Sequence, residues 1–408
     1  MAAAPRSLDT AVSPLTTAWI SAGGTGAQNY DEFADDAEIT EIVQQNPRSA
    51  LAVEMPHRAP GADVDDFAAA LPEARRRLAR AQGEGYYRPA REVVAIYRIS
   101  GEEGPSSLGL FAMVDTAEIS TEAGQPGRVI RNEDVFIAKV RQRVALVHAT
   151  GHLLSAVLLV QTDRAVELQA ALSAACEAAG EPDVVDRDPA GRRHEVWSVQ
   201  DPDTVANLCA LAGAGELVVA DGNHRTLAAQ MAELDRFLAV ITTAPALSLK
   251  PYHRLLRDWP AEAADPVQAF RDAGAQVEPL DGPVETPYSP GVVHLYTAGR
   301  GYAVRLPPPD PDATDVERMD HARVEQVVLG QVLRWDPSDE RITYVGGDYT
   351  ASWLCAAVDE GRADVALLIA PVTVEDFVRV NKQRSAMPRK STWFVPKARA
   401  GLVLADVR

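Results

Sequence analysis

The sequence contains little cysteine and little lysine. Its three cysteines, Cys176, Cys209 and Cys355, are far apart in the 408 residues and form no Cys-x-x-Cys pair. This spacing argues against a disulfide scaffold and against a zinc ribbon. Only five of the 40 basic residues are lysines, so arginine supplies most of the positive charge.

Long apolar runs are also absent. No stretch reaches the roughly 18 apolar residues that a membrane helix needs. The segment from Met1 to Thr17 lacks the apolar centre of a signal peptide. Hydrophobic residues make up 46% of the chain and charged residues 24%, which is the usual balance of a packed globular protein. We therefore expect a cytoplasmic protein without membrane partners, and the sequence leaves a homodimer open.

Positive charge is scarce over the whole chain. The 40 basic and 58 acidic residues give a net charge of −18, which repels phosphate backbones and disfavours nucleic acid as a general partner. Residues 379–408 are the exception, because they contain eight basic residues and one acidic residue, a local charge of +7. A function in nucleic-acid binding would depend on this segment alone.

The hydrophobic pattern predicts an α+β fold with mixed sheets and antiparallel pieces. At about 100–200 residues per domain, the length allows two to four domains or one composite unit. We expect an N-terminal α/β segment over residues 1–90, a core over 91–260 and a C-terminal α/β segment with a basic tail over 261–408, packed as one composite unit.

Individual elements follow from the same pattern. The start of residues 1–28 is expected to be frayed, and the apolar run within residues 49–54 is expected to be a strand. Helices are expected at residues 35–43, 64–82, 135–149, 165–179, 201–212, 225–234, 316–333, 349–360 and 374–383. Further strands are expected at residues 93–100, 108–116, 153–161, 194–198, 216–220, 240–243, 247–255, 342–345 and 365–369, with a hairpin over 292–306.

One segment combines an apolar strand, a glycine turn and the start of a helix, which continues with Thr226. The turn consists of Asp221, Gly222, Asn223 and His224, and the helix starts with Arg225. A helix N-terminus attracts phosphate, and Gly222 allows a ligand to approach the backbone closely. Arg225 adds a bidentate phosphate donor, while Asp221 and His224 are candidate ligands for a divalent cation. The alternative is an ordinary turn in which Asp221 or Asn223 caps the helix.

A second polar segment covers residues 130–134 and contains Glu133. Its acidic side chains are candidates for Mg²⁺ binding or for a general base. Lys139 and Arg143 follow on the predicted helix. A solvated charged loop that leads into the helix is the alternative.

A third polar segment contains Lys390, Ser391 and Thr392 near the end of the sequence. These three residues are similar to the end of a P-loop, but the glycines that cradle phosphates are absent upstream. The segment is therefore not a Walker A motif, although its side chains could still reach an anion. A solvated basic tail is the alternative.

The sequence resembles the bacterial and archaeal family of unknown function numbered 1015 over about residues 29–407. That family is similar to the ParB/sulfiredoxin-like proteins, which include free serine kinases. Five blocks carry the resemblance: Asn29-Tyr30-Asp31, Asn46-Pro47-Arg48-Ser49, residues 108–112, residues 221–225 (Asp-Gly-His-His-Arg in the family), and residues 387–394 with Pro396-Lys397.

The resemblance implies a ParB/sulfiredoxin-like core that binds a nucleotide. In the related serine kinases the Asp-Gly-His-His-Arg loop handles nucleotide phosphates and metal, and a glutamate acts as the base on the serine hydroxyl. By position, Glu133 would be that base. Asn223 and Asn132 replace histidines of the family pattern, and Val135 replaces a threonine.

We therefore expect a kinase that transfers a phosphoryl group from ATP or ADP to a hydroxyl of a small molecule, with serine or a serine-like metabolite as the first candidate. The expected catalytic residues are Glu133, Asp221 and His224, and the expected Mg²⁺ ligands are Asp221 and His224. The expected nucleotide-binding residues are Gly222, Asn223, Arg225, Thr226, Lys139, Arg143, Lys390, Ser391 and Thr392. The alternative is a non-catalytic nucleotide-binding regulatory protein, which the replaced histidines favour.

Overall fold

The computed structural model describes residues 11–62, 64, 66–101, 106–120, 127–131, 133, 135–260 and 265–408, with only the backbone at 374, 375, 378 and 382. By their contacts, the residues form two compact units. The first unit comprises Met1–Arg131, Val135–Ser248 and Pro396–Arg408, and the second comprises Asn132–Asp134 and Leu249–Val395. These boundaries differ from the three segments expected from the sequence, and that division stays a prediction.

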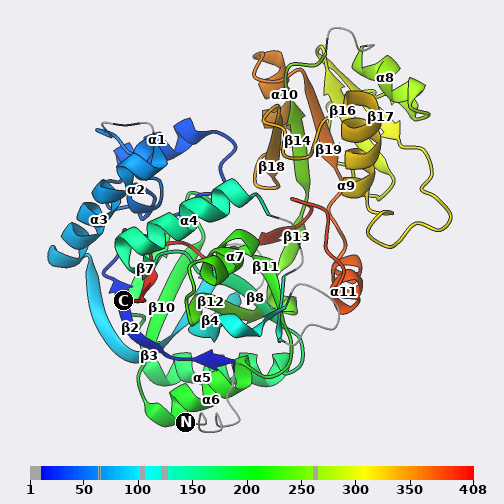
Figure 1. Cartoon of the computed structure of the whole chain (residues 1–408). Helices are drawn as coiled ribbons and strands as arrows, with labels where there is room; N and C mark the ends of the chain where they lie inside the picture. The colour runs from blue at the N-terminus through cyan, green and yellow to red at the C-terminus, as the bar shows by residue number, and fades with distance from the viewer. Residues whose placement is uncertain are drawn as a thin grey trace, which may run out of the picture. The chain divides into compact units, whose positions relative to one another are not determined.

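The first unit is built on a large mixed sheet with thirteen strands among the described residues (Figure 1). The strands are β1 (Val12–Ser13), β2 (Leu15–Ser21), β3 (Tyr87–Ser100), β4 (Ser107–Asp115), β5 (Ile119–Ser120), β6 (Val129–Ile130), β7 (His152–Leu153), β8 (Val157–Gln161), β9 (Val184–Arg187), β10 (Arg193–Val199), β11 (Leu217–Asp221), β12 (Arg236–Thr243) and β21 (Val403–Asp406). Along the main path the order is β5-β6-β11-β8-β12-β4-β3-β2-β21-β7. Parallel pairs such as β8 with β12 occur beside antiparallel ones, so the α+β class with mixed sheets is confirmed.

Strand β3 changes neighbours halfway along its length. Its first half pairs with β2, and its second half lies between β4 and β10. Glu92 lies at the change and has a φ of 47°, in the left-handed region that side chains other than glycine seldom adopt. The strand therefore bends at Glu92, which lets one chain segment serve two parts of the curled sheet.

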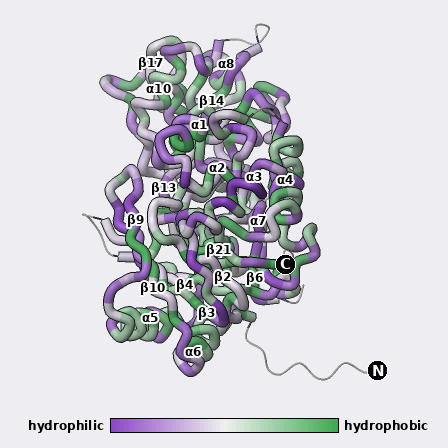
Figure 2. The backbone as a smooth tube through the Cα atoms, turned by 90° about the vertical axis from the view of Figure 1, so that its left-hand side faces the viewer, coloured by the Kyte–Doolittle hydropathy of each residue, from purple (hydrophilic) through white to green (hydrophobic). Residues whose placement is uncertain are grey.

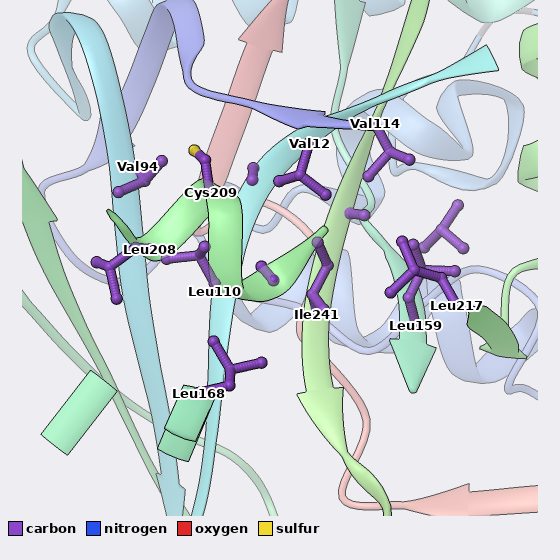
Figure 3. Packing of buried hydrophobic residues seen from close by; sticks show 14 of the residues in the cluster. Val12, Val94, Leu110, Val114, Leu159, Leu168, Leu208, Cys209, Leu217 and Ile241 are labelled. Atoms are coloured by element: carbon purple, nitrogen blue, oxygen red, sulfur yellow. The ribbon is translucent and has the colours of Figure 1, made fainter. Parts of the chain in front are cut away.

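The core of the first unit lies against both faces of the sheet. Strand β12 is buried along nearly its whole length, and its alternate residues Phe237 and Ile241 join the cluster that Leu168 and Leu208 enter from helices α5 and α6 (Figure 3). Helices α4 and α7 pack against each other, and α7 also contacts β8 and β12. The helices of this unit are α1 (Asp36–Gln45), α2 (Leu51–Glu54), α3 (Phe67–Gly83), α4 (Ile137–Thr150), α5 (Ala165–Ala179), α6 (Pro202–Ala212) and α7 (Asn223–Met231).

The second unit contains a smaller, antiparallel sheet. Its described strands follow the order β15-β17-β16-β19-β14-β18, with a separate pair formed by β13 (Ser248–Lys250) and β20 (Trp393–Val395). The sheet strands are β14 (Tyr252–Leu256), β15 (Gln276–Pro279), β16 (Val292–Thr297), β17 (Arg300–Arg305), β18 (Ile342–Gly346) and β19 (Val365–Ile369). The helices are α8 (Pro266–Asp272), α9 (Asp320–Arg323), a π-helical segment (Val324–Leu333), α10 (Ala351–Asp359) and α11 (Val374–Lys382).

Most expected helices and strands are confirmed, and the strand expected at residues 49–54 is wrong. Residues 49–54 are not a strand, because the apolar run forms the short buried helix α2. A short apolar run does not distinguish a buried strand from a buried helix by periodicity. The fraying expected at the start of residues 1–28 falls outside the residues that the structure describes. Leu15, Ala18 and Ile20 are buried in β2, which pairs with β3 and β21.

Hydrophilic and hydrophobic residues interleave along the helices of both units (Figure 2). Among the described residues, no helix combines the length and the apolar character that crossing a membrane requires. The three cysteines are free thiols, and Cys176 and Cys209 are buried in the core of the first unit.

Candidate functional site

The predicted phosphate turn begins at an irregularity in β11. The pairing with β8 shifts between Val219 and Asp221, so Asp221 lies opposite Leu158 instead of following the regular alternation. Leu217 and Val219 point into the apolar core, and without the extra residue Asp221 would point there too. The bulge therefore turns the Asp221 carboxylate to the other face of the sheet.

Gly222 connects the bulge to helix α7. Its φ is +103°, and a Cβ added to it would lie 3.1 Å from Arg225 Nε and 3.3 Å from the Cα of Val157. A side chain would be strained by the backbone angle and crowded by the guanidinium. The glycine is thus required for the approach of Arg225 to the turn.

Arg225 and Lys397 both bind the Asp221 carboxylate. Arg225 Nη2 donates to Asp221 Oδ2, and Lys397 Nζ lies 2.8 Å from Asp221 Oδ1. Arg225 Nη1 also donates to Ala156 O and, at 3.3 Å, to Asn29 Oδ1. Burial opposes ionisation of Asp221, but the charges of Lys397 and Arg225 outweigh it and lower the pKa of the carboxyl.

Asn29 links this ion pair to a second carboxylate. Its side-chain nitrogen donates to Glu32 Oε1 at 2.6 Å and to Ala398 O at 3.2 Å. Burial raises the pKa of Glu32 to about 7, although Lys397 acts in the opposite direction. We call Asn29, Glu32, Asp221, Arg225 and Lys397 the ionic cluster. All five belong to the first unit.

Arg143 lies in a neighbouring part of the interior of the first unit. Its guanidinium is 3.8 Å from the centre of the Tyr30 ring, and its Nη2 donates to Glu54 O at 3.1 Å. Ser155 donates to Glu54 Oε1, yet burial raises the pKa of Glu54. Two guanidinium nitrogens of Arg143, Nε and Nη1, have no hydrogen-bond partner.

The other predicted residues of this region lie around α4 and α7. His224 Nε2 accepts from the backbone N–H of Phe136 at 3.0 Å, and the two rings stack. Thr226 is fully buried, and its hydroxyl donates to Asn223 O at 2.8 Å. Lys139 is exposed, with its ammonium 6.0 Å from the Phe136 ring centre. The nucleotide roles of Asn223, Thr226, Lys139 and Arg143 stay predictions.

A group of three or more side chains suited to a metal ion does not occur among the described residues. Both oxygens of Asp221 accept bonds from cations, and His224 Nε2 accepts a backbone N–H. This donor set does not fit Mg²⁺ in the present arrangement, and we derive no chemistry through a metal.

The remaining predicted residues belong to the second unit. The backbone of Glu133 forms an isolated parallel β-bridge with that of Met387. The neighbours of Glu133, Asn132 and Asp134, lie outside the described residues. Lys390 is 5.4 Å from the Tyr252 ring centre, and Arg254 donates to the carbonyls of Arg389 and Lys390. Glu133 as the base and Lys390, Ser391 and Thr392 as nucleotide ligands stay predictions.

The segment that contains Lys390 is packed into the second unit rather than solvated. Ser391 is fully buried, and Trp393 is 1% exposed, with its ring 5.2 Å from that of Tyr252. Gly346 makes room for it, since a Cβ there would lie 2.1 Å from the Trp393 ring. The alternative of a solvated basic tail is wrong for these residues.

Sequence reasoning did not assign three residues of the ionic cluster. Asn29 and Lys397 lie in two of the blocks that carry the family resemblance, so those blocks held the signal. Glu32 is the residue directly after the first block, and no pattern in the sequence indicated a role for it. The structure brings three distant blocks together around Asp221.

Comparisons with known proteins were made for the sequence and the fold. No curated protein matches the sequence. The chain is similar to a free serine kinase in complex with AMP, with 12% identity, a TM-score of 0.38 and coverage of 70% of this chain and 87% of that chain. It is similar to a conserved hypothetical protein from Pyrococcus furiosus, with 13% identity, a TM-score of 0.38 and coverage of 72% and 95%. It is also similar to SbnI with a C-terminal truncation from Staphylococcus aureus, with 10% identity, a TM-score of 0.39 and coverage of 71% and 85%.

A family model described as "Protein of unknown function (DUF1015)" matches residues 23–325, which is most of the sequence. The chain therefore belongs to the DUF1015 family.

Proposed function

We propose that the protein is a nucleotide-dependent kinase that phosphorylates a hydroxyl of a small molecule, with serine or a serine-like metabolite as the first candidate. The observation that carries the proposal is the ionic cluster at the start of α7. Two cations and a carboxylate are held there by three of the sequence blocks that carry the family resemblance, and the resemblance associates one of them, residues 221–225, with nucleotide phosphates. An ordinary helix cap would not require them.

The cluster offers the parts that phosphoryl transfer needs. Such transfer depends mostly on positioning and on stabilising negative charge. Lys397 and the positive end of the α7 helix dipole supply positive charge at one place. A phosphate that engages Lys397 would compete with Asp221 for the ammonium group, and Arg225 would remain as the cationic partner of Asp221.

A general base for the acceptor hydroxyl is the second requirement. Glu133 is the base expected from the sequence. Glu32 is a further candidate, because its carboxyl belongs to the same cluster as Lys397 and its pKa of about 7 suits proton transfer near neutral pH. The variants Glu133→Gln and Glu32→Gln distinguish the two candidates. Replacement of the true base should lower the phosphorylation rate about 10²–10⁴-fold.

The test is a melting scan of the full chain with ATP, ADP, CTP or GTP, each with and without L-serine and Mg²⁺. A ligand at 100 times its Kd adds about 2.7 kcal/mol, which shifts the melting temperature by several degrees. Lys397→Met should abolish the shift. Lys250→Met is the matched control, because Lys250 also lies 2.8 Å from an aspartate but on the surface.

The outcomes separate the two candidate functions. Nucleotide consumption together with phosphorylation of the acceptor supports the kinase. Nucleotide binding without consumption supports the regulatory protein, which the asparagine at position 223 and the engagement of both Asp221 oxygens favour. If no nucleotide shifts the melting temperature, both proposals fail.

A further inference from the structure

A cavity lies inside the first unit, between helices α4 and α7 and strands β8 and β12. Its polar lining gathers in one place. Arg143 donates to the carbonyl of Glu54, Ser155 donates to the carboxyl of Glu54, and Arg225 donates to Ala156, the residue after Ser155. The cavity therefore has a polar end built from two guanidinium groups, a carboxyl and a hydroxyl.

Some nitrogens of the two guanidinium groups at this end make no hydrogen bond. Arg143 is 7% exposed and Arg225 is 9% exposed. Nε and Nη1 of Arg143 and Nε of Arg225 have no hydrogen-bond partner. A buried N–H without a partner costs about 1–3 kcal/mol, and more on a charged group. These three donors are therefore suited to an anionic acceptor.

Glu54 does not supply the acceptor that these guanidinium donors lack. Glu54 Oε2 also lacks a hydrogen-bond partner, and burial raises the pKa of its carboxyl, which favours the neutral form. Asp221 is already shared between Arg225 and Lys397. A ligand carboxylate would supply the missing acceptor oxygens and offset the charge of Arg143.

Apart from His152, the rest of the lining is mostly apolar. Leu146 and Val147 contribute from α4, and Leu234, Phe237 and Leu238 close the space near β12. An inorganic oxyanion such as phosphate would leave its oxygens against these side chains without hydrogen bonds, which is costly. An alkyl group suits the same surface.

The size of the cavity limits the ligand. The space open to the centres of water molecules is about 50 Å³. One water needs about 10–15 Å³ on that scale, so the cavity accommodates roughly three to five water-sized atoms. Propionate has a carboxylate and a two-carbon alkyl group, and it matches this size.

We propose that this cavity binds a short aliphatic carboxylate of two to four carbons. The carboxylate accepts from Arg143 and Arg225, and the alkyl group packs among Leu146, Leu234 and Phe237. The site shares Arg225 with the ionic cluster, but carboxylate binding requires no nucleotide and is tested without one.

The experiment titrates the full chain with sodium propionate, acetate, hexanoate or phosphate at constant ionic strength, without nucleotide, and follows the melting temperature and the heat of binding. Propionate should give a saturable shift, acetate a weaker one, and hexanoate and phosphate none. No saturable response to propionate, or a response only at molar concentrations, would overturn the proposal. A response to phosphate that equals or exceeds that to propionate would also overturn it.

Two variants locate the binding. Ala228 lines the cavity from α7, so Ala228→Leu should fill the space and weaken propionate binding at least tenfold. Ala178→Leu is the matched control on the exposed side of α5 and should bind like the wild type. Arg143→Met should also bind at least tenfold more weakly. Should these variants fail to fold, magnetisation transfer from ¹³C-propionate to the methyl groups of Leu146 and Leu234 decides the matter on the wild-type protein.

Discussion

The contribution of an ion pair to the stability of this protein depends mainly on how deeply its side chains are buried. Two lysine–aspartate pairs show this with equal geometry, because Lys397–Asp221 and Lys250–Asp348 both have an N–O distance of 2.8 Å. The Lys397 side chain is 11% exposed and that of Lys250 is 41% exposed. Water screens the second pair but hardly reaches the first.

Replacing Lys397 with methionine should therefore destabilise the first unit strongly. The variant leaves the buried Asp221 carboxylate with Arg225 as its remaining cationic partner, and removal of one partner of a buried pair costs about 3–5 kcal/mol. Lys250→Met should cost less than about 1 kcal/mol. Urea unfolding of both variants checks the difference, and equal losses would contradict it.

Glu32 should make stability depend on pH in a defined direction. Its pKa is about 7 in the folded chain and 4.5 when unperturbed. Because the folded value is raised, the stabilisation from the protonated form is present below pH 4.5 and is lost as the pH rises through 7. Glu32→Gln does not ionise, so it should be more stable than the wild type by about 3 kcal/mol at pH 8.

The same variant should gain less than about 1 kcal/mol at pH 5, where the wild-type carboxyl is still protonated in the folded chain. Denaturant midpoints at the two pH values measure the effect. A gain that does not change with pH would mean that Glu32 is not the group that titrates.

At the scale of elements, the site depends on the junction of β11 and α7. The bulge turns Asp221 away from the apolar core, and Gly222 lets the chain reverse close to Arg225. The two features act together, because the ion pair spans the turn from residue 221 to residue 225.

Gly222→Ala should disrupt this junction beyond the cost of its backbone angle. The new Cβ would press on Arg225 Nε and would move the guanidinium away from Asp221. Gly23→Ala is the control, because Gly23 has a similar φ of +109° with nothing within 4 Å. Gly222→Ala should lose at least about 1 kcal/mol more than Gly23→Ala, since it adds crowding to a similar backbone strain. Thermal unfolding compares the two, and equal losses would show that the contact with Arg225 has no energetic role.

The strand–turn–helix at residues 217–231 was predictable from the sequence, because an apolar run followed by Asp-Gly gives a strong local signal. The same holds for α5, whose bounds match the expectation. Asn29 and Lys397 were not assigned, since their contacts with residues 225 and 221 depend on pairing across 196 and 176 positions. The buried helix α2 was missed because four apolar residues carry no readable period.

At the scale of the whole molecule, buried histidines with lowered pKa values lie in both units. In the second unit, burial lowers the pKa of His253 to about 3 and that of His321 well below 6.5. Both rings are buried, and His253 Nδ1 accepts the Ile369 N–H at 3.2 Å. In the first unit, burial likewise lowers the pKa values of His152 and His194, while the raised pKa values of Glu32 and Glu54 act in the opposite sense on acidification.

The second unit should therefore lose stability as the pH falls. A histidine with a lowered folded pKa stabilises above its unfolded pKa of 6.5 and loses that contribution below it, by up to about 1.4 kcal/mol per pH unit. Hydrogen exchange from pH 7 to 4.5 should show a progressive loss of protection in β14 and β19 as the pH falls. His253→Gln should reduce by about half the slope of the second unit's stability against pH. An unchanged slope would mean that His253 does not cause the pH dependence.

The pairing of β21 with β2 and β7 also has a consequence for synthesis. Residues 396–408 are translated after the entire second unit, yet they supply Lys397 and the strand between β2 and β7. Until they emerge from the ribosome, the sheet of the first unit retains two unpaired strand edges, which favour aggregation. A chain that is truncated before residue 396 by a premature stop codon should therefore aggregate and be degraded instead of folding.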